Sequence, residues 1–301
     1  MHEVISLLIN RHDFFLQLLW EHIEISLSAS IIAIIIGGLL GVLIHEYKRL
    51  SGPVMLIVNF LYTIPSISML GLLLYISGVG NTTAIIALVI YALLPMVRNT
   101  FTGLDQIKSD MREAGIALGL TRLQRLWNIE IPLAMPTIMA GIRTMLVMTI
   151  ALTGIASFIG AGGLGVAIYR GITTNQSALT IAGSLLIALL AIVVDALFSL
   201  GERVTRISPH MKRYTIIFLS VMTLIAMAVG GWSLYCRHVK ADVIHIATKP
   251  MTEQLILGNA LKELIEHKTG LTVEVTEGVG GGTSNIQPAM RSGQFDIYPE
   301  Y

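Results

Sequence analysis

EAGIALGLTRLQRLWNIEIPLAMP, residues 113–136, is the stretch that decides how the rest of the chain is interpreted. It is polar and basic, and it lies between hydrophobic runs long enough to cross a membrane. Apolar residues recur along it at helical spacing: Ile116, Leu120, Leu123, Leu126 and Trp127. This spacing predicts an amphipathic helix with one apolar face. Gly119 is predicted either to interrupt the helix or to let another backbone approach closely. Pro132 and Pro136 are predicted to end it and begin the next span.

The motif within this stretch resembles the EAA loop of ABC-importer permeases. Glu113-Ala114-Gly115 is followed by Gly119, and nine residues later come Ile129-Glu130-Ile131-Pro132. The spacing matches the family pattern, with Gly115 in place of the second alanine and Ile131 in place of leucine. The resemblance implies a short cytoplasmic coupling helix that seats in a groove of a separate ATPase subunit. The residues implied in this contact are Glu113, Ala114, Gly115, Gly119, Ile129 and Pro132. The alternative is an ordinary amphipathic helix on the membrane surface.

The composition predicts a membrane protein with several spans. The chain has 301 residues, of which 54% are hydrophobic and 13% are charged. Soluble domains contain about 25% charged residues. The net charge of +1 does not inform on nucleic-acid binding, and no basic cluster is dense enough to suggest it, so no nucleic-acid partner is expected. The one cysteine, Cys236, excludes a disulfide framework and a cysteine-based metal site, and no metal site is expected.

The apolar runs predict an all-α polytopic domain, and the resemblance implies the type I ABC importer permease fold. Residues 1–22 are predicted to lie in the membrane interface, with Trp20 as an anchor. The permease domain is expected at 23–210, and a linking span at 211–237. Each span is near the ~20 residues that a bilayer requires. Within the permease domain the core spans are expected at 23–44, 53–76, 83–104, 136–159 and 179–200, with a coupling loop at 105–135.

The loop charges predict the orientation in the cell membrane. Ten basic residues follow the first, third and fifth spans: Lys48, Arg49, Lys108, Arg112, Arg122, Arg125, Arg203, Arg206, Lys212 and Arg213. The opposite short segments contribute only Arg11 and Arg170. The positive-inside rule therefore places residues 105–135 in the cytoplasm, and the N-terminus and residues 241–301 outside.

Charges and prolines within the spans leave alternatives open. Arg143 is predicted either to act within the membrane or to extend to the cytoplasmic interface. Asp195 is predicted to act at a pathway, or to pair with Arg143 or with a partner chain. Pro65 and Pro95 predict kinks, around a pathway or for packing alone.

The glycine-rich stretch GAGGLG, residues 160–165, fits the letters of a dinucleotide-binding motif. It follows an expected membrane helix and not a strand, so that interpretation fails. The stretch resembles the external glycine-rich loop of the same permeases.

Residues 241–301 predict a soluble α/β unit, because strand and helix signals alternate. Strands are expected at 243–247 and 271–276, and a helix at 253–267, followed by a glycine loop and a further helix. Three motifs resemble the start of the extracellular substrate-binding domain of osmoprotectant ABC systems, which take glycine betaine, carnitine or choline. These are KPMTEQ (249–254), GVGGGTSN (278–285) and FDIYPEY (295–301).

This second resemblance implies a ligand with a quaternary ammonium and a carboxylate. Aromatic faces hold such a cation, and the family's cage motif maps onto Asp296 and Tyr298. A carboxylate requires a cation and hydroxyl donors, and the family's lysine maps onto Lys249. Thr283 and Gln254 are candidate polar partners. The alternative for Tyr298 is an ordinary tyrosine at a strand end.

A two-lobed domain of this type needs on the order of 250 residues, whereas only about 60 follow the linking span. We therefore expect a truncated binding domain that is poorly ordered and does not bind ligand by itself.

The leading hypothesis is the permease subunit of an ATP-driven importer for glycine betaine, carnitine or choline, used in osmoprotection. The expected partners are an ABC ATPase subunit and a second permease copy, either identical or a paralogue. No Walker A motif occurs in the sequence, so ATP is expected to bind the ATPase subunit, and this chain is expected to need no cofactor. No catalytic motif occurs in the spans, so we expect no enzyme activity. The alternatives are a permease for another small solute such as an amino acid, and a membrane-anchored binding receptor without transport.

Overall fold

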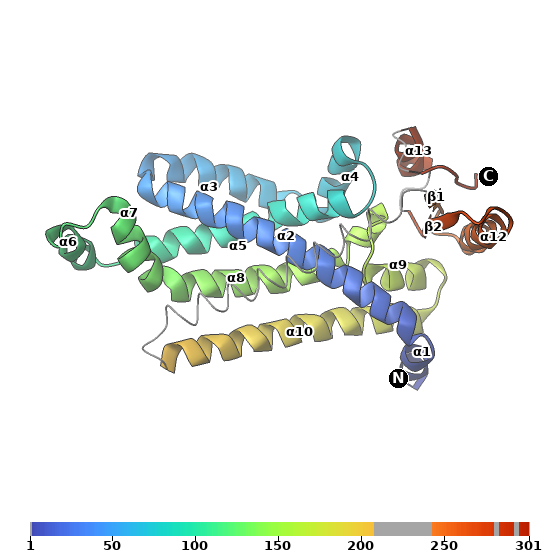
Figure 1. Cartoon of the computed structure of the whole chain (residues 1–301), viewed down its shortest axis with the longest axis horizontal. Helices are drawn as coiled ribbons and strands as arrows, with labels where there is room; N and C mark the ends of the chain where they lie inside the picture. Colours follow the sequence, from blue (N-terminus) through green and yellow to red (C-terminus); the bar gives the residue numbers. More distant parts are fainter. Residues whose placement is uncertain (1, 208–242, 280–282, 292–294, 301) are drawn as a thin grey trace.

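The computed structural model describes residues 2–207, 243–279, 283–291 and 295–300. The linking span predicted at 211–237 lies outside these residues. The described part of the permease region is a bundle of long helices that run along the long axis of the molecule (Figure 1). The long elements are α2 (His12–Glu46), α3 (Lys48–Thr63), α4 (Ser66–Ser77), α5 (Asn81–Asp105), α8 (Ile131–Thr153) and α10 (Ser177–Ile207).

Shorter elements lie at the two ends of the bundle. One end carries α6 (Ser109–Ala117), α7 (Arg122–Arg125) and the π-helix η1 (Leu126–Glu130). The other carries α1 (His2–Asn10), the 3₁₀ helix η2 (Ala156–Ile159) and α9 (Gly165–Thr173). Four helices in the described residues are long and apolar enough to cross a membrane, or five if the bent pair α3–α4 is one span. The predicted all-α polytopic architecture is confirmed.

The predicted span 53–76 is broken in the middle. Helices α3 and α4 meet at an angle of 100°. Pro65 is the cause, because a proline disfavours the helical conformation of the residue before it. Ile64 accordingly has extended dihedral angles, φ −67° and ψ 128°. The kink expected at Pro65 is therefore a full interruption, whereas α5 continues through Pro95.

Two further boundaries differ from the expectation. Helix α2 already begins at His12, so residues 12–22 belong to the same helix as the first span and not to a separate interfacial segment. Helix α8 spans Ile131–Thr153, with Pro132 in its first turn and Pro136 in its interior. The prediction that these two prolines end one helix and begin the next is wrong, because residues 122–153 form one continuous helix that runs through both.

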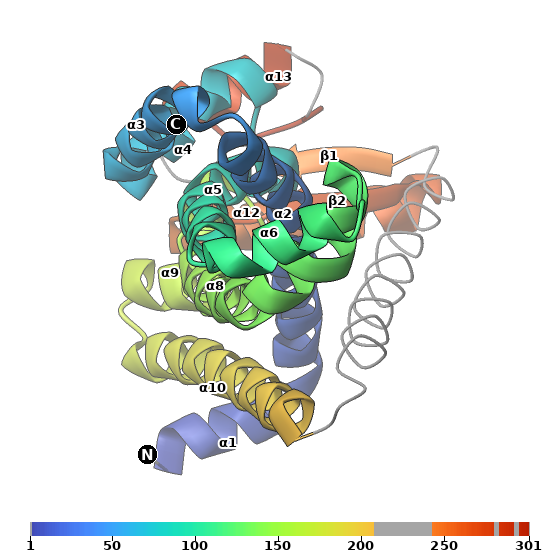
Figure 2. The same cartoon turned by 90° about the vertical axis from the view of Figure 1, so that its left-hand side faces the viewer.

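Glycines allow the central helices to approach closely. Gly37 and Gly41 form a G-x-x-x-G pattern on α2, and a Cβ at Gly41 would lie 2.5 Å from the Cβ of Thr100 on α5. A Cβ at Gly141 on α8 would lie 2.4 Å from the Cβ of Asn99. Small residues let helix backbones pack tightly in a membrane, where van der Waals contact drives association. Figure 2 shows α2, α5 and α8 grouped together when the bundle is viewed from its α6 end.

Two of the charged residues inside the predicted spans, Arg143 and Asp195, pair with each other. Arg143 on α8 donates to Asp195 on α10 through Nε, 2.5 Å from Oδ1, and through Nη2, 2.6 Å from Oδ2. This bidentate geometry is the strongest form of a guanidinium–carboxylate contact. The pair with Arg143, one of the alternatives predicted for Asp195, is therefore present in the structure.

Neutralising Asp195 is expected to destabilise the bundle, because Arg143 would remain charged within a span without its carboxylate. Asp195→Asn should lower the amount of monodisperse protein extracted in detergent and its thermal midpoint. The charge-exchanged variant Arg143→Asp/Asp195→Arg should recover most of both. A single variant as stable as the original chain would show that the pair is dispensable.

The C-terminal residues form a small α/β unit. It contains β1 (Val243–Ala247), α12 (Thr252–Thr269), β2 (Thr272–Thr276) and α13 (Thr283–Arg291). The two strands are parallel, with Val243 opposite Thr272, and α12 connects them. Gly270 ends α12 with φ +68°, a conformation that suits glycine. The predicted partial α/β lobe is confirmed.

Candidate functional site

Two groups of predicted site residues lie at opposite ends of the molecule. The first belongs to residues 105–135, here called the α6–α7 segment. The second belongs to the unit formed by β1, α12, β2 and α13, here called the C-terminal lobe (Figure 1).

Gly119 interrupts the helix of the α6–α7 segment. Its φ is +72°, and among the described residues no atom lies within 4 Å of a Cβ built there. Of the two predicted roles, the structure therefore shows the interruption and not a close backbone approach. Thr121 then begins α7 with a capping box. The Gln124 N–H donates to Thr121 Oγ1 at 3.4 Å, and the Thr121 N–H donates to Gln124 Oε1 at 2.9 Å.

The prediction of one amphipathic helix in this segment is wrong, because its apolar residues are divided between α6 and the helix that begins at Arg122. Ile116 on one side and Leu123 and Trp127 on the other remain 59–66% exposed. Leu126 instead turns inward and is buried. These three exposed apolar side chains all belong to the α6–α7 end of the bundle.

Gly115 connects the two halves of the sequence motif. It is buried, whereas Glu113 and Ala114 are exposed. A Cβ at Gly115 would lie 3.0 Å from Ile129 Cδ1 and 3.3 Å from Arg125 Cγ. Gly115 replaces the second alanine of the family pattern, and it lies in a tight contact with Ile129 and Arg125, where a Cβ would be crowded. The structure brings Gly115 and Ile129 together although the motif separates them.

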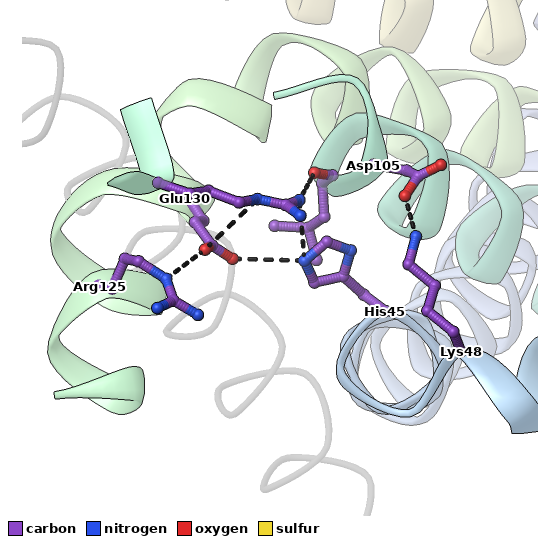
Figure 3. Close-up of polar contacts among 7 residues, drawn as sticks. His45, Lys48, Asp105, Arg125 and Glu130 are labelled. Atoms are coloured by element: carbon purple, nitrogen blue, oxygen red, sulfur yellow. Dashed lines mark hydrogen bonds and ion pairs between the residues drawn. The ribbon is translucent and has the colours of Figure 1, made fainter. Parts of the chain in front are cut away.

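Glu130 is a site residue that the sequence analysis missed. Its side chain is only 1% exposed, and its carboxylate faces three cationic or titratable groups (Figure 3). Arg125 Nε lies 2.7 Å from Oε1, Arg112 Nε lies 3.7 Å from Oε1, and His45 Nε2 lies 3.3 Å from Oε2. The motif leaves this position unspecified. A carboxylate between two isoleucines was the only local signal.

A metal ion fits this cluster poorly. His45, Glu46 and Glu130 offer ligand atoms within 4.8 Å of one another. Two guanidinium groups already neutralise the Glu130 carboxylate, and a divalent cation would be repelled by both.

The glycine-rich stretch at 160–165 is held by side chains of the bundle. The Gly162 N–H donates to Asn81 Oδ1 and the Gly163 N–H to Glu21 Oε2, each at 3.0 Å. Gly163 has φ +96°, which other residues rarely adopt. These N–H groups are occupied by the protein, and a phosphate would need them free.

Lys249 lies at the centre of a polar cluster in the C-terminal lobe. It is 7% exposed and forms an ion pair with Glu300. Thr283 Oγ1 donates to Glu300 Oε2 at 2.8 Å, and the Tyr298 hydroxyl hydrogen-bonds the same carboxylate. Lys249, followed by Thr283, lowers the pKa of Glu300 to about 2. The Glu300 carboxylate raises the pKa of Tyr298.

The structure brings together three of the five predicted ligand residues: Lys249, Thr283 and Tyr298. It does not bring Asp296 or Gln254 to them. Asp296 Oδ2 accepts the His245 N–H at 2.8 Å, which fastens the loop to β1. Gln254 is fully buried, and its amide has no hydrogen-bond partner among the residues that the structure describes. Glu300 was not among the predicted ligand residues, although it lies within the quoted motif FDIYPEY.

The lobe also contacts the bundle. Arg170 of α9 forms an ion pair with Glu277, with Nη1 2.8 Å from Oε2. Asn259 donates to the other oxygen of Glu277, also at 2.8 Å. Tyr169 lies beside Gly278 and lines a shallow hollow between α9 and the lobe.

Comparison with known families divides the chain into the same two parts, the helical bundle and the C-terminal lobe. Residues 31–207 match the family described as "Binding-protein-dependent transport system inner membrane component". Residues 242–301 match "Substrate binding domain of ABC-type glycine betaine transport system".

Relatives and solved structures that are similar to this chain include two curated permease proteins and one ABC transporter. The ergothioneine transport permease/ergothioneine binding protein EgtU of Helicobacter pylori is 36% identical over 90% of this chain, which spans 50% of that protein. The glycine betaine/carnitine/choline transport system permease protein OpuCD of Bacillus subtilis is 42% identical over 66% of this chain and 87% of its own length. The inward-facing MetNI methionine ABC transporter shares the fold, with a TM-score of 0.60 and 21% identity over 63% of this chain and 95% of its own.

Proposed function

This chain belongs to the family of binding-protein-dependent transport system inner membrane components, and from that premise we propose that it is the permease subunit of an ATP-driven importer for quaternary-ammonium solutes. The observation that carries the proposal is the presence of two matches in one chain. A permease region is followed by a region similar to a glycine betaine-binding domain. Glycine betaine, carnitine and choline are the proposed solutes, since they name the transport system of the Bacillus relative.

In this proposal the α6–α7 segment faces the cytoplasm and docks on an ABC ATPase subunit. The exposed apolar surface of Ile116, Leu123 and Trp127 supports the contact, as does the excess of basic residues at that end. The C-terminal lobe then lies outside. A second permease copy completes the translocation path. ATP binds to the ATPase subunits and not to this chain.

The Lys249 cluster is proposed to hold the carboxylate of the solute. Lys249, Thr283 and Tyr298 already surround a carboxylate, that of Glu300, and their geometry therefore suits one. The Glu300 side chain is 42% exposed, so a solute can exchange with it. The ring of Tyr298 would then lie near the quaternary ammonium.

Ergothioneine is a second candidate solute. The Helicobacter relative named for it matches 90% of this chain, which includes part of the C-terminal lobe. Ergothioneine is itself a trimethylammonium betaine, and the same carboxylate site would serve it.

Uptake in a transport-deficient host tests the proposal. The 301-residue chain is co-expressed with an osmoprotectant ATPase, both by itself and fused to a complete binding domain. We expect ATP-dependent uptake of labelled glycine betaine in at least one form. Unlabelled carnitine, choline, ergothioneine and methionine serve as competitors and rank the solutes. Competition by methionine alone would favour an amino acid importer, and binding without uptake would favour a receptor.

Lys249→Ala is expected to lower the uptake of carboxylate-bearing solutes by roughly tenfold or more, because a charge-assisted hydrogen bond contributes about 1.5–3 kcal/mol. Choline has no carboxylate and should be affected less. The matched control is Lys262→Ala, an exposed lysine on α12. Equal losses for choline and glycine betaine would show that Lys249 only supports the fold.

A further inference from the structure

The carboxylate of Glu130 joins elements that are distant in sequence. His45 comes from the last turn of α2 and Arg125 from α7, and both face the buried carboxylate of Glu130 (Figure 3). Arg112 of α6 lies 3.7 Å from the same carboxylate. Arg112 also donates through Nη2 to the carbonyl oxygen of Leu104 at the end of α5, at 2.8 Å. Glu130 therefore connects the α6–α7 segment to α2 through His45, and Arg112 connects it to α5 through Leu104.

The position of Glu130 in its helix suits this role. Residues 122–153 form one continuous helix that contains a π turn, and Glu130 ends that turn. A π turn inserts an extra residue and is found frequently at functional sites. Glu130 thus lies where α7 joins α8 within one helix, and its carboxylate faces His45 of α2.

Helix α6 depends on this contact because it packs mainly on its own segment. Its neighbours are η1 and α7, together with the polar contacts of Arg112. A buried ion pair that loses one partner leaves an uncompensated charge, so the cluster has to hold or rearrange as a unit.

His45 has two alternative partners within the cluster. Its Nε2 lies 3.3 Å from Glu130 Oε2 and 3.2 Å from Arg112 Nη2. When Nε2 carries a proton it donates to Glu130, and when it does not it accepts from Arg112. It cannot satisfy both, and two discrete arrangements are the requirement for a switching element.

We propose that Glu130 is the positioning residue that passes movement of the α6–α7 segment to α2, by holding Arg112, Arg125 and His45 on one buried carboxylate. This inference rests on the proposed function, in which an ATPase moves that segment. It assigns to Glu130 a role in coupling and none in contact with the ATPase or the solute, since its side chain is buried.

The first experiment measures coupling in proteoliposomes that contain the chain and its ATPase partner. Glu130→Gln should reduce uptake by roughly tenfold, within the range usual for coupling between sites, while ATP hydrolysis and ATPase association fall far less. Glu130→Asp retains the charge and should recover part of the uptake. The matched control is Asp110→Asn, an exposed acid on α6, which should transport at the original rate.

The second experiment needs no transport. Spin labels are placed at Met111 on α6 and at Tyr47 after α2, both exposed, in a Cys236→Ser background. Double electron–electron resonance should give a narrow distance distribution for the original chain and a broader one for Glu130→Gln.

The outcomes distinguish failure of the proposed function from failure of the role of Glu130. If the original chain shows no ATP-dependent uptake, the proposed function fails, and the distance distribution alone decides whether Glu130 holds α6 near α2. An unchanged distribution overturns the inference. A broader distribution with uptake close to the original rate also overturns it, because Glu130 would then only stabilise the fold.

Discussion

Replacing Leu123 and Trp127 by aspartate is expected to abolish association with the ATPase while the permease remains folded. Both side chains are more than 60% exposed, so their loss leaves the core of the bundle intact. In an interface, a buried aromatic anchor commonly contributes about 2–4 kcal/mol. The loss of two apolar anchors and the burial of two carboxylates should therefore weaken binding by roughly a hundredfold or more.

The measurement is co-purification of the ATPase with the double variant in mild detergent. Ser109→Asp adds charge to the same segment without removing an apolar side chain and should retain the partner. Leu126→Asp is the opposite control, because this buried residue should unfold the segment. Normal co-purification by the Leu123→Asp/Trp127→Asp variant would disprove docking through this surface.

Replacing Gly141 by leucine is expected to prevent the bundle from forming. A Cβ there would lie 2.4 Å from the Cβ of Asn99, well inside van der Waals contact. Overpacking usually costs about 1–3 kcal/mol, and more when neither backbone can move. Helix α8 packs on α5, so the whole interface between these two helices would have to separate to admit the leucine side chain.

The expected result is aggregation in size-exclusion chromatography and loss of a cooperative thermal transition. Gly71→Leu is the matched control. Gly71 is also a helical glycine, on α4, and no described atom lies within 4 Å of a Cβ there. If Gly141→Leu behaves like Gly71→Leu, close packing of α8 against α5 is not essential.

The residues of the α6–α7 segment show how far sequence patterns could predict the site. The spacing from Glu113 to Pro132 located the segment and identified Gly119 as special. It left two roles open for Gly119, because helix interruption and close approach both require glycine. Only the backbone angle and the empty space around Gly119 distinguished them. The prediction of a single apolar helix face was wrong, because the spacing of apolar residues continues in the sequence past Gly119, where the helix is interrupted.

The sequence by itself determined the membrane-protein class, the positions of most apolar helices and the α/β character of the C-terminal lobe. These follow from hydropathy, periodicity and turn residues, which are properties of neighbouring residues. Tertiary structure alone decided the contacts that give individual residues their roles. Arg143 meets Asp195 across 52 positions, and Lys249 meets Glu300 across 51. Arg112 meets His45 across 67, beside the Glu130 carboxylate. Such pairs depend on how whole helices and strands pack, and local patterns carry no information about that packing.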